Sequence, residues 1–236
     1  MKLISNRART HAGAVVVTLA ALGAAIPGAT ATPHDKYEPI QIPQNELNAS
    51  SDELTNGSPI VLRNGTKVIG SCSATVTDRN YILTAGHCGN AGVSVEFDGK
   101  KIGTAVKNGL ADGFDVLKIE LNPHGKKVLG EIMEVDEDYA PKEGDPVSKE
   151  GFRSKHTEGT VAEDELSDDS SAESINEPSD GPRHLVQTWF ADLLSVPGDS
   201  GGPVIHDDKV IGLIKGGRTK DDTTVTPIKE SLEVLN

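Results

Sequence analysis

Short runs of alternating apolar and polar residues, separated by turns, dominate the chain from Pro59 onward. Alternation with a period of two predicts half-buried β-strands. In the first half of the chain we expect strands at 59–62, 68–70, 73–76, 81–83, 93–97, 102–106 and 116–121. Asn64-Gly65 and Asp98-Gly99 are typical of tight hairpin turns between antiparallel strands. No segment of this half has the apolar spacing of a long helix.

A second group of strands follows a stretch rich in Gly, Pro and acidic residues. We expect these strands at or near 147, 160–161, 185–188, 203–205 and 210–214. Thr226, followed by Pro227, is typical of the N-cap and first position of a short terminal helix. Residues 162–182 hold eight Asp or Glu and no Lys or Arg. We expect a solvated loop there, with a calcium or partner site as the alternative.

The N-terminal region has a different pattern. Three positive charges within residues 1–9 precede an apolar run at 12–26, and Ala29-Thr30-Ala31 offers the small residues that signal peptidase prefers. We interpret 1–31 as a secretory signal peptide, with an uncleaved membrane anchor as the alternative. Residues 32–58 are polar and lack apolar periodicity, so we expect a propeptide or disordered arm. These features predict a secreted, extracellular protein that is not inserted in a membrane after signal cleavage.

The charge and the Cys and His content of the chain limit the partners, cross-links and metal sites that it can have. The 236 residues carry a formal net charge of −13, and loss of the three positive charges of the signal would leave −16. A body this acidic repels nucleic acid and anionic membranes. Cys72 and Cys88 flank a predicted hairpin in an exported chain, which favours a disulfide over a metal site or a free thiol. The histidines other than His87 lack the paired spacing of a metal site, so we expect neither a metal nor a cofactor.

Two motifs carry the candidate chemistry. Thr84-Ala85-Gly86-His87-Cys88 supplies an imidazole, and Gly198-Asp199-Ser200-Gly201-Gly202-Pro203 supplies a serine between glycines. Serine is a weak nucleophile that needs a base to take its proton and fixed donors to hold the oxyanion. The glycines let a substrate carbonyl approach the N–H groups of Gly198 and Ser200. We therefore predict a serine peptidase in which Ser200 is the nucleophile and His87 the base.

A serine–histidine pair works better when a buried carboxylate orients the imidazole. Asp115 directly precedes an apolar strand, which would carry one carboxylate to the junction of the two lobes. Asp112 is the alternative, although it lies in a glycine-flanked turn that favours solvent exposure. The order His87, Asp115, Ser200 is one of the known orders for such a triad.

These motifs resemble those of the chymotrypsin-like serine peptidases, especially the bacterial secreted streptogrisin type, over about residues 58–236. The resemblance implies two perpendicular, antiparallel, six-stranded β-barrels with the active site in the cleft between them and a short C-terminal helix. It implies that His87 and Asp115 come from the first barrel and Ser200 from the second. The boundaries we expect for the first barrel, linker and second barrel are 59–129, 130–145 and 146–236.

The resemblance also implies a buried ion pair for Asp199. Trypsin-like relatives pair this carboxylate with a new N-terminal amine, but no basic residue immediately precedes Ile60 here. Streptogrisins use an internal arginine in a segment that lines up with 147–151, where this chain offers Lys149. We expect an Asp199–Lys149 pair, with a solvent-exposed Lys149 as the alternative.

The expected substrate pocket departs from the family pattern. Leu194 stands where trypsin-like members carry the acid that binds Lys or Arg, which favours apolar side chains in the pocket. Lys215 replaces a serine that bonds to the catalytic carboxylate in relatives, so its ammonium is expected either to perturb Asp115 or to point into solvent. Gly216 and Gly217 are expected to form the edge that pairs with an extended substrate.

Together these features predict a monomeric, secreted serine endopeptidase that acts on protein or peptide substrates through an acyl-enzyme intermediate. One alternative is a non-catalytic or zymogen-like binding protein on the same fold. The other is an esterase or related acyl-transfer enzyme, because the same groups cleave esters.

Overall fold

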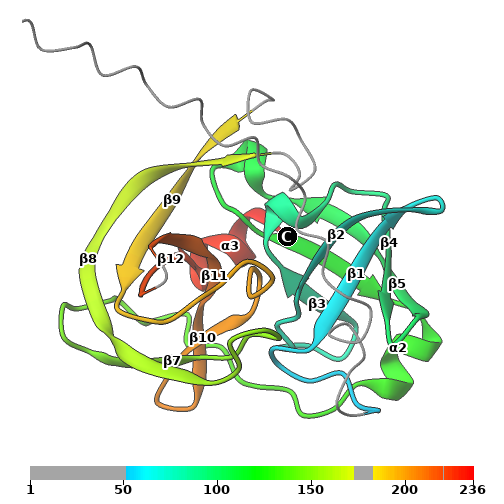
Figure 1. Ribbon diagram of the computed structural model, residues 1–236, viewed down its shortest axis with the longest axis horizontal. Helices are drawn as coiled ribbons and strands as arrows, with labels where there is room; N and C mark the ends of the chain where they lie inside the picture. The colour runs from blue at the N-terminus through cyan, green and yellow to red at the C-terminus, as the bar shows by residue number, and fades with distance from the viewer. Residues whose placement is uncertain (1–51, 173–182, 220) are drawn as a thin grey trace, which may run out of the picture. The chain divides into compact units, whose positions relative to one another are not determined.

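The computed structural model describes residues 52–172, 183–219 and 221–236, and its strands form two antiparallel units (Figure 1). The first is a six-stranded sheet in the order β2-β1-β4-β5-β6-β3. Its strands are β1 (Pro59–Asn64), β2 (Lys67–Ser73), β3 (Tyr81–Thr84), β4 (Ser94–Phe97), β5 (Lys100–Asn108) and β6 (Leu117–Leu121). An isolated bridge pairs Leu83 of β3 with Thr75, which lies two residues after the end of β2.

The second unit is a closed barrel in the order β10-β11-β12-β9-β8-β7. Its strands are β7 (Pro146–Lys149), β8 (Thr157–Ala172), β9 (Arg183–Ala191), β10 (Pro203–His206), β11 (Lys209–Thr219) and β12 (Asp222–Pro227). In Figure 1, β8 and β9 form the long curved pair at the left, and helix α3 (Ile228–Val234) follows β12. The expected all-β fold of two six-stranded units with a short C-terminal helix is confirmed, although strand pairing closes only the second unit.

Each unit encloses a largely aliphatic core. In β1 the alternation of the sequence becomes alternating burial, with Ile60 and Leu62 fully buried and their neighbours partly exposed. The core of the second unit includes Trp189, the largest fully buried side chain. A third cluster draws on both units and on the C-terminal helix, and its buried members are Leu83, Val116, Val210, Leu213, Ile228 and Leu235. This shared cluster holds the two units against each other.

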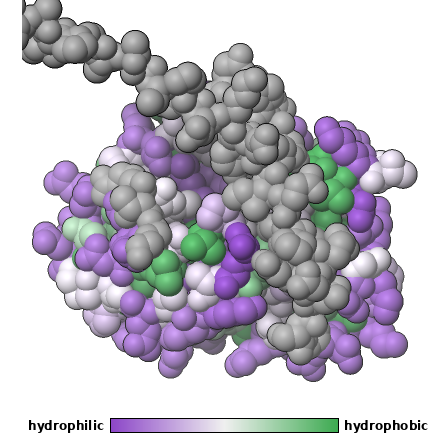
Figure 2. Space-filling model, in the orientation of Figure 1, coloured by the Kyte–Doolittle hydropathy of each residue, from purple (hydrophilic) through white to green (hydrophobic). Residues whose placement is uncertain are grey.

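The face of the molecule in Figure 2 is mostly hydrophilic, and its hydrophobic residues form small separate patches. The exposed large hydrophobic side chains are Val68, Val106, Leu166, Leu185 and Leu194. Within the described ranges, no helix combines the length and the apolar character needed to cross a bilayer. The predicted signal peptide and most of the predicted arm lie outside the described residues.

The last residues of the predicted arm are part of the folded body. Leu54 is fully buried, and its N–H donates to the Val128 carbonyl at 2.8 Å. The Asn56 side chain accepts from the Val76 N–H at 2.7 Å and donates to the Val76 carbonyl at 3.4 Å. The prediction of a loose arm over 32–58 is therefore wrong for its C-terminal end. A single buried leucine in a polar segment leaves no periodic pattern in the sequence.

The acid-rich segment also departs from its predicted structure. Its residues up to Ala172 belong to β8, which pairs with β9 from Val161 opposite Ala191 to Ala172 opposite Arg183. Residues 173–182 lie outside the described residues. The expectation of a solvated loop is wrong for the first part, because its backbone N–H and C=O groups form hydrogen bonds with β9. Most of the acidic side chains on this strand stay exposed.

The two hairpin predictions had different outcomes. Asn64 still pairs with Lys67, so the first turn is centred on Gly65-Thr66 and lies one residue later than predicted. The second turn is as predicted, with φ of 47° at Asp98 and 69° at Gly99. Two consecutive positive φ values are characteristic of the type I′ turn that joins twisted antiparallel strands.

One helix was not predicted, and the start of another was placed one residue too early. Helix α2 (Pro123–Val128) was not predicted, and it begins after Asn122, whose side chain accepts from the Gly125 N–H at 2.8 Å. Helix α3 has Pro227 as its N-cap, so the predicted N-cap at Thr226 is one residue too early. Thr226 instead belongs to β12, a strand that the sequence pattern did not indicate, and it is fully buried.

Candidate active site

Ser200 lies in the loop that leads into β10, and the glycines beside it have conformations that other residues rarely adopt. The φ angles are +109° at Gly198 and +83° at Gly201. A Cβ atom on Gly201 would lie 2.1 Å from Thr84 Oγ1. Thr84 ends β3, directly before the segment that carries His87, so this close approach brings the two sequence motifs together.

The candidate base, His87, lies on the 3-10 helix η1 (Gly86–Cys88), which is held from two sides. A disulfide joins Cys88 to Cys72 at the end of β2. On the other side, the Asn108 side chain donates to the carbonyl oxygens of Gly86 and Gly89, each at 2.8 Å. Both attachments restrict the backbone that positions the imidazole.

Asp115 is the carboxylate that the structure brings to His87. It is fully buried, and it follows the 3-10 helix η2 (Leu110–Asp112). His87 Nδ1 lies 2.7 Å from Asp115 Oδ2, and the His87 backbone N–H donates to Oδ1 at 2.8 Å. Asp112, the alternative, is exposed at the end of η2. The two contacts fix the orientation of the Asp115 carboxylate plane relative to the imidazole ring.

The environment of Asp115 favours its ionised form. Burial alone would raise the pKa of this carboxyl, but the charge of His87, its hydrogen bond, the charge of Lys215 and the Ser171 hydroxyl outweigh burial and lower the pKa to about 2. A carboxylate that remains negative can fix the imidazole tautomer and stabilise an imidazolium.

Acidification is expected to remove the contribution of Asp115 to stability. Because its pKa is lowered from 3.8 to about 2 in the folded chain, the stabilisation is present above pH about 4 and is lost as the pH falls through about 2. This shift corresponds to about 2 kcal/mol. We expect the difference in unfolding free energy between wild type and Asp115→Asn, measured with urea, to shrink by about 2 kcal/mol over that range. A difference independent of pH would contradict the lowered pKa.

The Ser200 hydroxyl bonds to a backbone carbonyl rather than to the imidazole. Its Oγ donates to the Lys215 carbonyl at 3.2 Å, and no hydrogen bond joins it to His87 in the described part of the chain. Catalytic hydrogen bonds are often long or poorly aligned in the absence of substrate. The structure thus joins His87 to Asp115 and holds the serine hydroxyl on β11.

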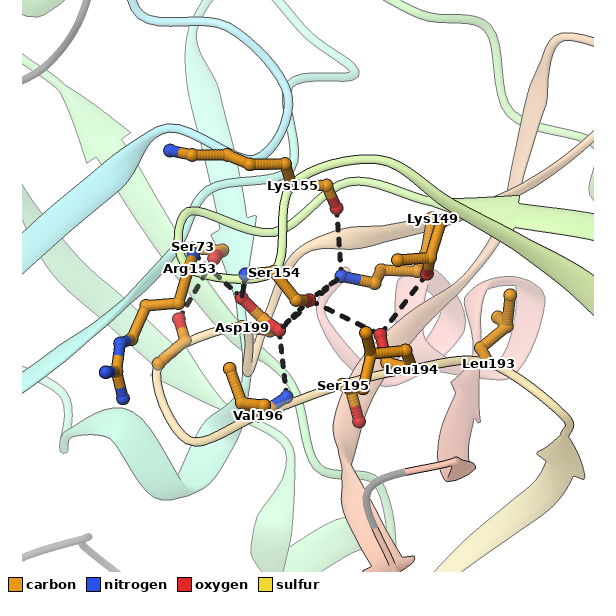
Figure 3. A network of polar contacts seen from close by, with 12 residues as sticks. Ser73, Lys149, Arg153, Ser154, Lys155, Leu193, Leu194, Ser195, Val196 and Asp199 are labelled. Carbon is orange, nitrogen blue, oxygen red and sulfur yellow. Dashed lines mark hydrogen bonds and ion pairs between the residues drawn. The ribbon is translucent and has the colours of Figure 1, made fainter.

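Asp199 is surrounded by hydrogen-bond donors (Figure 3). Backbone N–H groups of Arg153, Ser154 and Val196 donate to its carboxylate at 2.9, 3.1 and 2.9 Å, and the Ser154 hydroxyl also bonds to it. Burial would raise the pKa of Asp199, but these hydrogen bonds and the charge of Lys149 lower it. Asp199 is therefore an ionised side chain at the base of the Ser200 loop.

Lys149 is the cation of this network. Its side chain is fully buried, and Nζ lies 3.4 Å from Asp199 Oδ2. Nζ also donates to the Lys155 carbonyl at 2.9 Å and to the Ser154 hydroxyl. Burial lowers the pKa of Lys149, and the charge of Asp199 opposes this effect. The structure brings together the two residues of the expected ion pair, and Lys149 is not exposed.

The residues expected to form the pocket lie near these groups. Leu194 is 38% exposed, and its carbonyl accepts from the Ser154 hydroxyl at 3.3 Å. Gly216 and Gly217 pair with β12 on one side, beyond the part of β11 that pairs with β10. The Lys215 ammonium points to Asp169 Oδ2 at 2.8 Å, and its side chain is 12% exposed. Lys215 is therefore paired rather than directed into solvent.

Two residues in contact with the site had no signal in the sequence. Ser154 bonds to both members of the Lys149–Asp199 pair, and Ser171 donates to Asp115 Oδ2 at 2.7 Å. Neither belongs to a recognisable motif, and both reach the site only through the pairing of distant segments. Their roles could be found only from the folded chain.

Comparison with known proteins gives matches of two kinds. The family model described as Trypsin matches residues 53–233. Among solved structures, chymotrypsin from Cellulomonas bogoriensis is similar with a TM-score of 0.59 and 19% identity, covering 78% of this chain and 96% of that one. Protease A from Thermobifida fusca has a TM-score of 0.58 and 20% identity, with coverage of 78% and 96%. Nocardiopsis protease has a TM-score of 0.56 and 18% identity, with coverage of 77% and 95%. A comparison with curated protein sequences finds no match.

Proposed function

The chain belongs to the trypsin family of serine peptidases, and from this membership we propose that it is a secreted endopeptidase that cleaves peptide bonds through an acyl-enzyme intermediate. The observation that carries the proposal is the double contact between His87 and the buried Asp115. A buried carboxylate that accepts from both the backbone and the ring of one histidine fixes the imidazole for proton transfer.

In the proposed reaction, Ser200 Oγ leaves the Lys215 carbonyl and attacks the carbonyl carbon of the substrate. Its proton passes to His87 Nε2, and Asp115 stabilises the imidazolium that forms. The C–N bond then breaks, and the same proton passes to the leaving amine. Water repeats the sequence on the acyl-enzyme, which releases the acid and restores Ser200. No cofactor takes part in these steps.

The oxyanion is proposed to bind to the N–H groups of Gly198 and Ser200. Preorganised donors contribute to catalysis because they need no reorganisation as charge develops. The positive φ of Gly198 and the donors around Asp199 support a loop that is already fixed before substrate binds. The same geometry would serve an ester substrate, so peptide and ester rates must both be measured.

Export is proposed from the features of residues 1–31 and from the disulfide, which is typical of oxidising compartments. We propose that signal cleavage follows Ala31 and that any further processing spares the buried Leu54. The mature enzyme would then act outside the cell, as a monomer, on protein or peptide substrates.

The proposal can be tested by intact mass spectrometry of the secreted protein before and after treatment with a fluorophosphonate. We expect one adduct on wild type and none on Ser200→Ala, because only an activated serine reacts. The starting mass would also give the mature N-terminus. Absence of an adduct from the mature, folded chain would overturn the proposal. It would favour a binding protein in which the Ser200 hydroxyl stays hydrogen-bonded to the Lys215 carbonyl.

A further inference from the structure

The carboxylate of Asp115 has a third donor that comes from the acid-rich strand β8. Ser171 is only 4% exposed, and its hydroxyl donates to Asp115 Oδ2 at 2.7 Å. His87 Nδ1 lies 2.7 Å from the same oxygen, while Oδ1 accepts the His87 N–H at 2.8 Å. Both carboxylate oxygens therefore have hydrogen bonds, and rotation of the carboxylate would break at least one of them.

The position of Ser171 follows from the pairing of β8 with β9. Ser171 is opposite His184 in this pair, and the Gln187 N–H of β9 donates to the Gly113 carbonyl at 2.9 Å. That bond ties β9 to the turn that leads to Asp115. Because side chains alternate along a strand, Ser171 is buried at the carboxylate while Ser170 is exposed.

The same side of β8 also holds the Lys215 ammonium. Asp169, two residues before Ser171, accepts from Lys215 Nζ at 2.8 Å. The charge of Lys215 acts on Asp115, so an unpaired ammonium at this place would compete with an imidazolium for the carboxylate. Its pairing with Asp169 reduces this competition. The Lys215 backbone meanwhile accepts the Ser200 hydroxyl, so Lys215 contacts both the nucleophile and β8.

We propose that Ser171 is a positioning residue for the reaction: its hydroxyl fixes the Asp115 carboxylate against His87, and Asp169 keeps the Lys215 ammonium away from that carboxylate. This inference rests on the proposed peptidase function. It assigns the first part of the acid-rich segment to the active site, where the sequence predicted a solvated loop, with a calcium or partner site as the alternative. The hydroxyl acts through Asp115 and does not touch the reacting atoms.

The test compares Ser171→Ala with Ser170→Ala, its exposed neighbour on the same strand, in the full secreted chain. For a chromogenic peptide amide, we expect kcat to fall about 10- to 100-fold in Ser171→Ala, with KM changed by less than about threefold, because one charge-assisted hydrogen bond to the carboxylate is lost. Ser170→Ala should match wild type. Ser171→Thr, which restores a hydroxyl, should recover most of the rate.

A second readout does not depend on turnover. A proton on His87 Nδ1 that bonds to Asp115 should give a downfield NMR resonance, and we expect this resonance to move in Ser171→Ala but not in Ser170→Ala. An unchanged resonance together with a kcat within about twofold of an active wild type would overturn the positioning role. If wild type itself shows no Ser200-dependent hydrolysis, the peptidase proposal fails, and the resonance still decides whether Ser171 positions the carboxylate.

Asp169 provides an independent arm of the test. Asp169→Asn leaves Lys215 charged and unpaired, and we expect kcat to fall about tenfold. Adding Lys215→Met to this variant removes the uncompensated charge and should recover part of the loss. If Asp169→Asn alone has the wild-type kcat, the role assigned to Asp169 is wrong.

Discussion

Ser200→Ala is expected to lower kcat for peptide hydrolysis by about 10⁶-fold, because loss of the proposed nucleophile would remove the proposed acyl-enzyme route. The melting temperature of the variant should be close to that of wild type. The contacts that hold the loop, such as the Ser73 N–H donating to the Ser200 carbonyl at 2.8 Å, use the backbone and remain in the variant. The measurement is the initial rate with one peptide substrate at saturating concentration, alongside a thermal melt.

The control for this prediction is Ser94→Ala on β4, which alters a serine of the first sheet outside the site. It should retain the wild-type rate. A Ser200→Ala variant that still hydrolyses peptides within tenfold of wild type would show that the nucleophile lies elsewhere. Such a result would leave the hydrogen bond from the Ser200 hydroxyl to the Lys215 carbonyl with a structural role alone.

The parts of the site that sequence could predict are those with local signals. His87 and Ser200 lie in motifs whose glycines have a direct structural reason, as the +83° φ of Gly201 and its approach to Thr84 show. Asp115 could be preferred over Asp112 because an apolar strand follows it directly. Each of these inferences depends on neighbours within a few residues.

The parts that sequence could not predict depend on distant pairing. Ser171 lies in a run of acids and serines without apolar alternation, and it becomes part of the site only because β9 pairs with β8 and also bonds to Gly113. Leu54 is similar, since its strand-like contact with Leu129 joins segments far apart in the chain. Local propensity does not encode such pairings.

Lys149→Ala is expected to lower the free energy of unfolding by about 3–5 kcal/mol, because it leaves the fully buried Asp199 without its cation. Hydrolysis should also fall sharply. Asp199 accepts N–H groups from Arg153, Ser154 and Val196, so movement of its carboxylate would disturb the loop that carries Gly198. Urea denaturation and kcat/KM for the same variant measure the two effects.

A double variant separates the effect of the two charges of this pair on stability from the effect of the Asp199 hydrogen bonds on activity. In Lys149→Met with Asp199→Asn, neither side chain is charged, so we expect part of the lost stability to return, since no buried charge is left without a partner. Activity should not return to the same extent, because an amide accepts hydrogen bonds through only one oxygen and cannot bond to all the N–H groups that the two carboxylate oxygens of Asp199 serve. Lys149→Ala with wild-type stability and activity would show that the loop is held by its backbone hydrogen bonds alone.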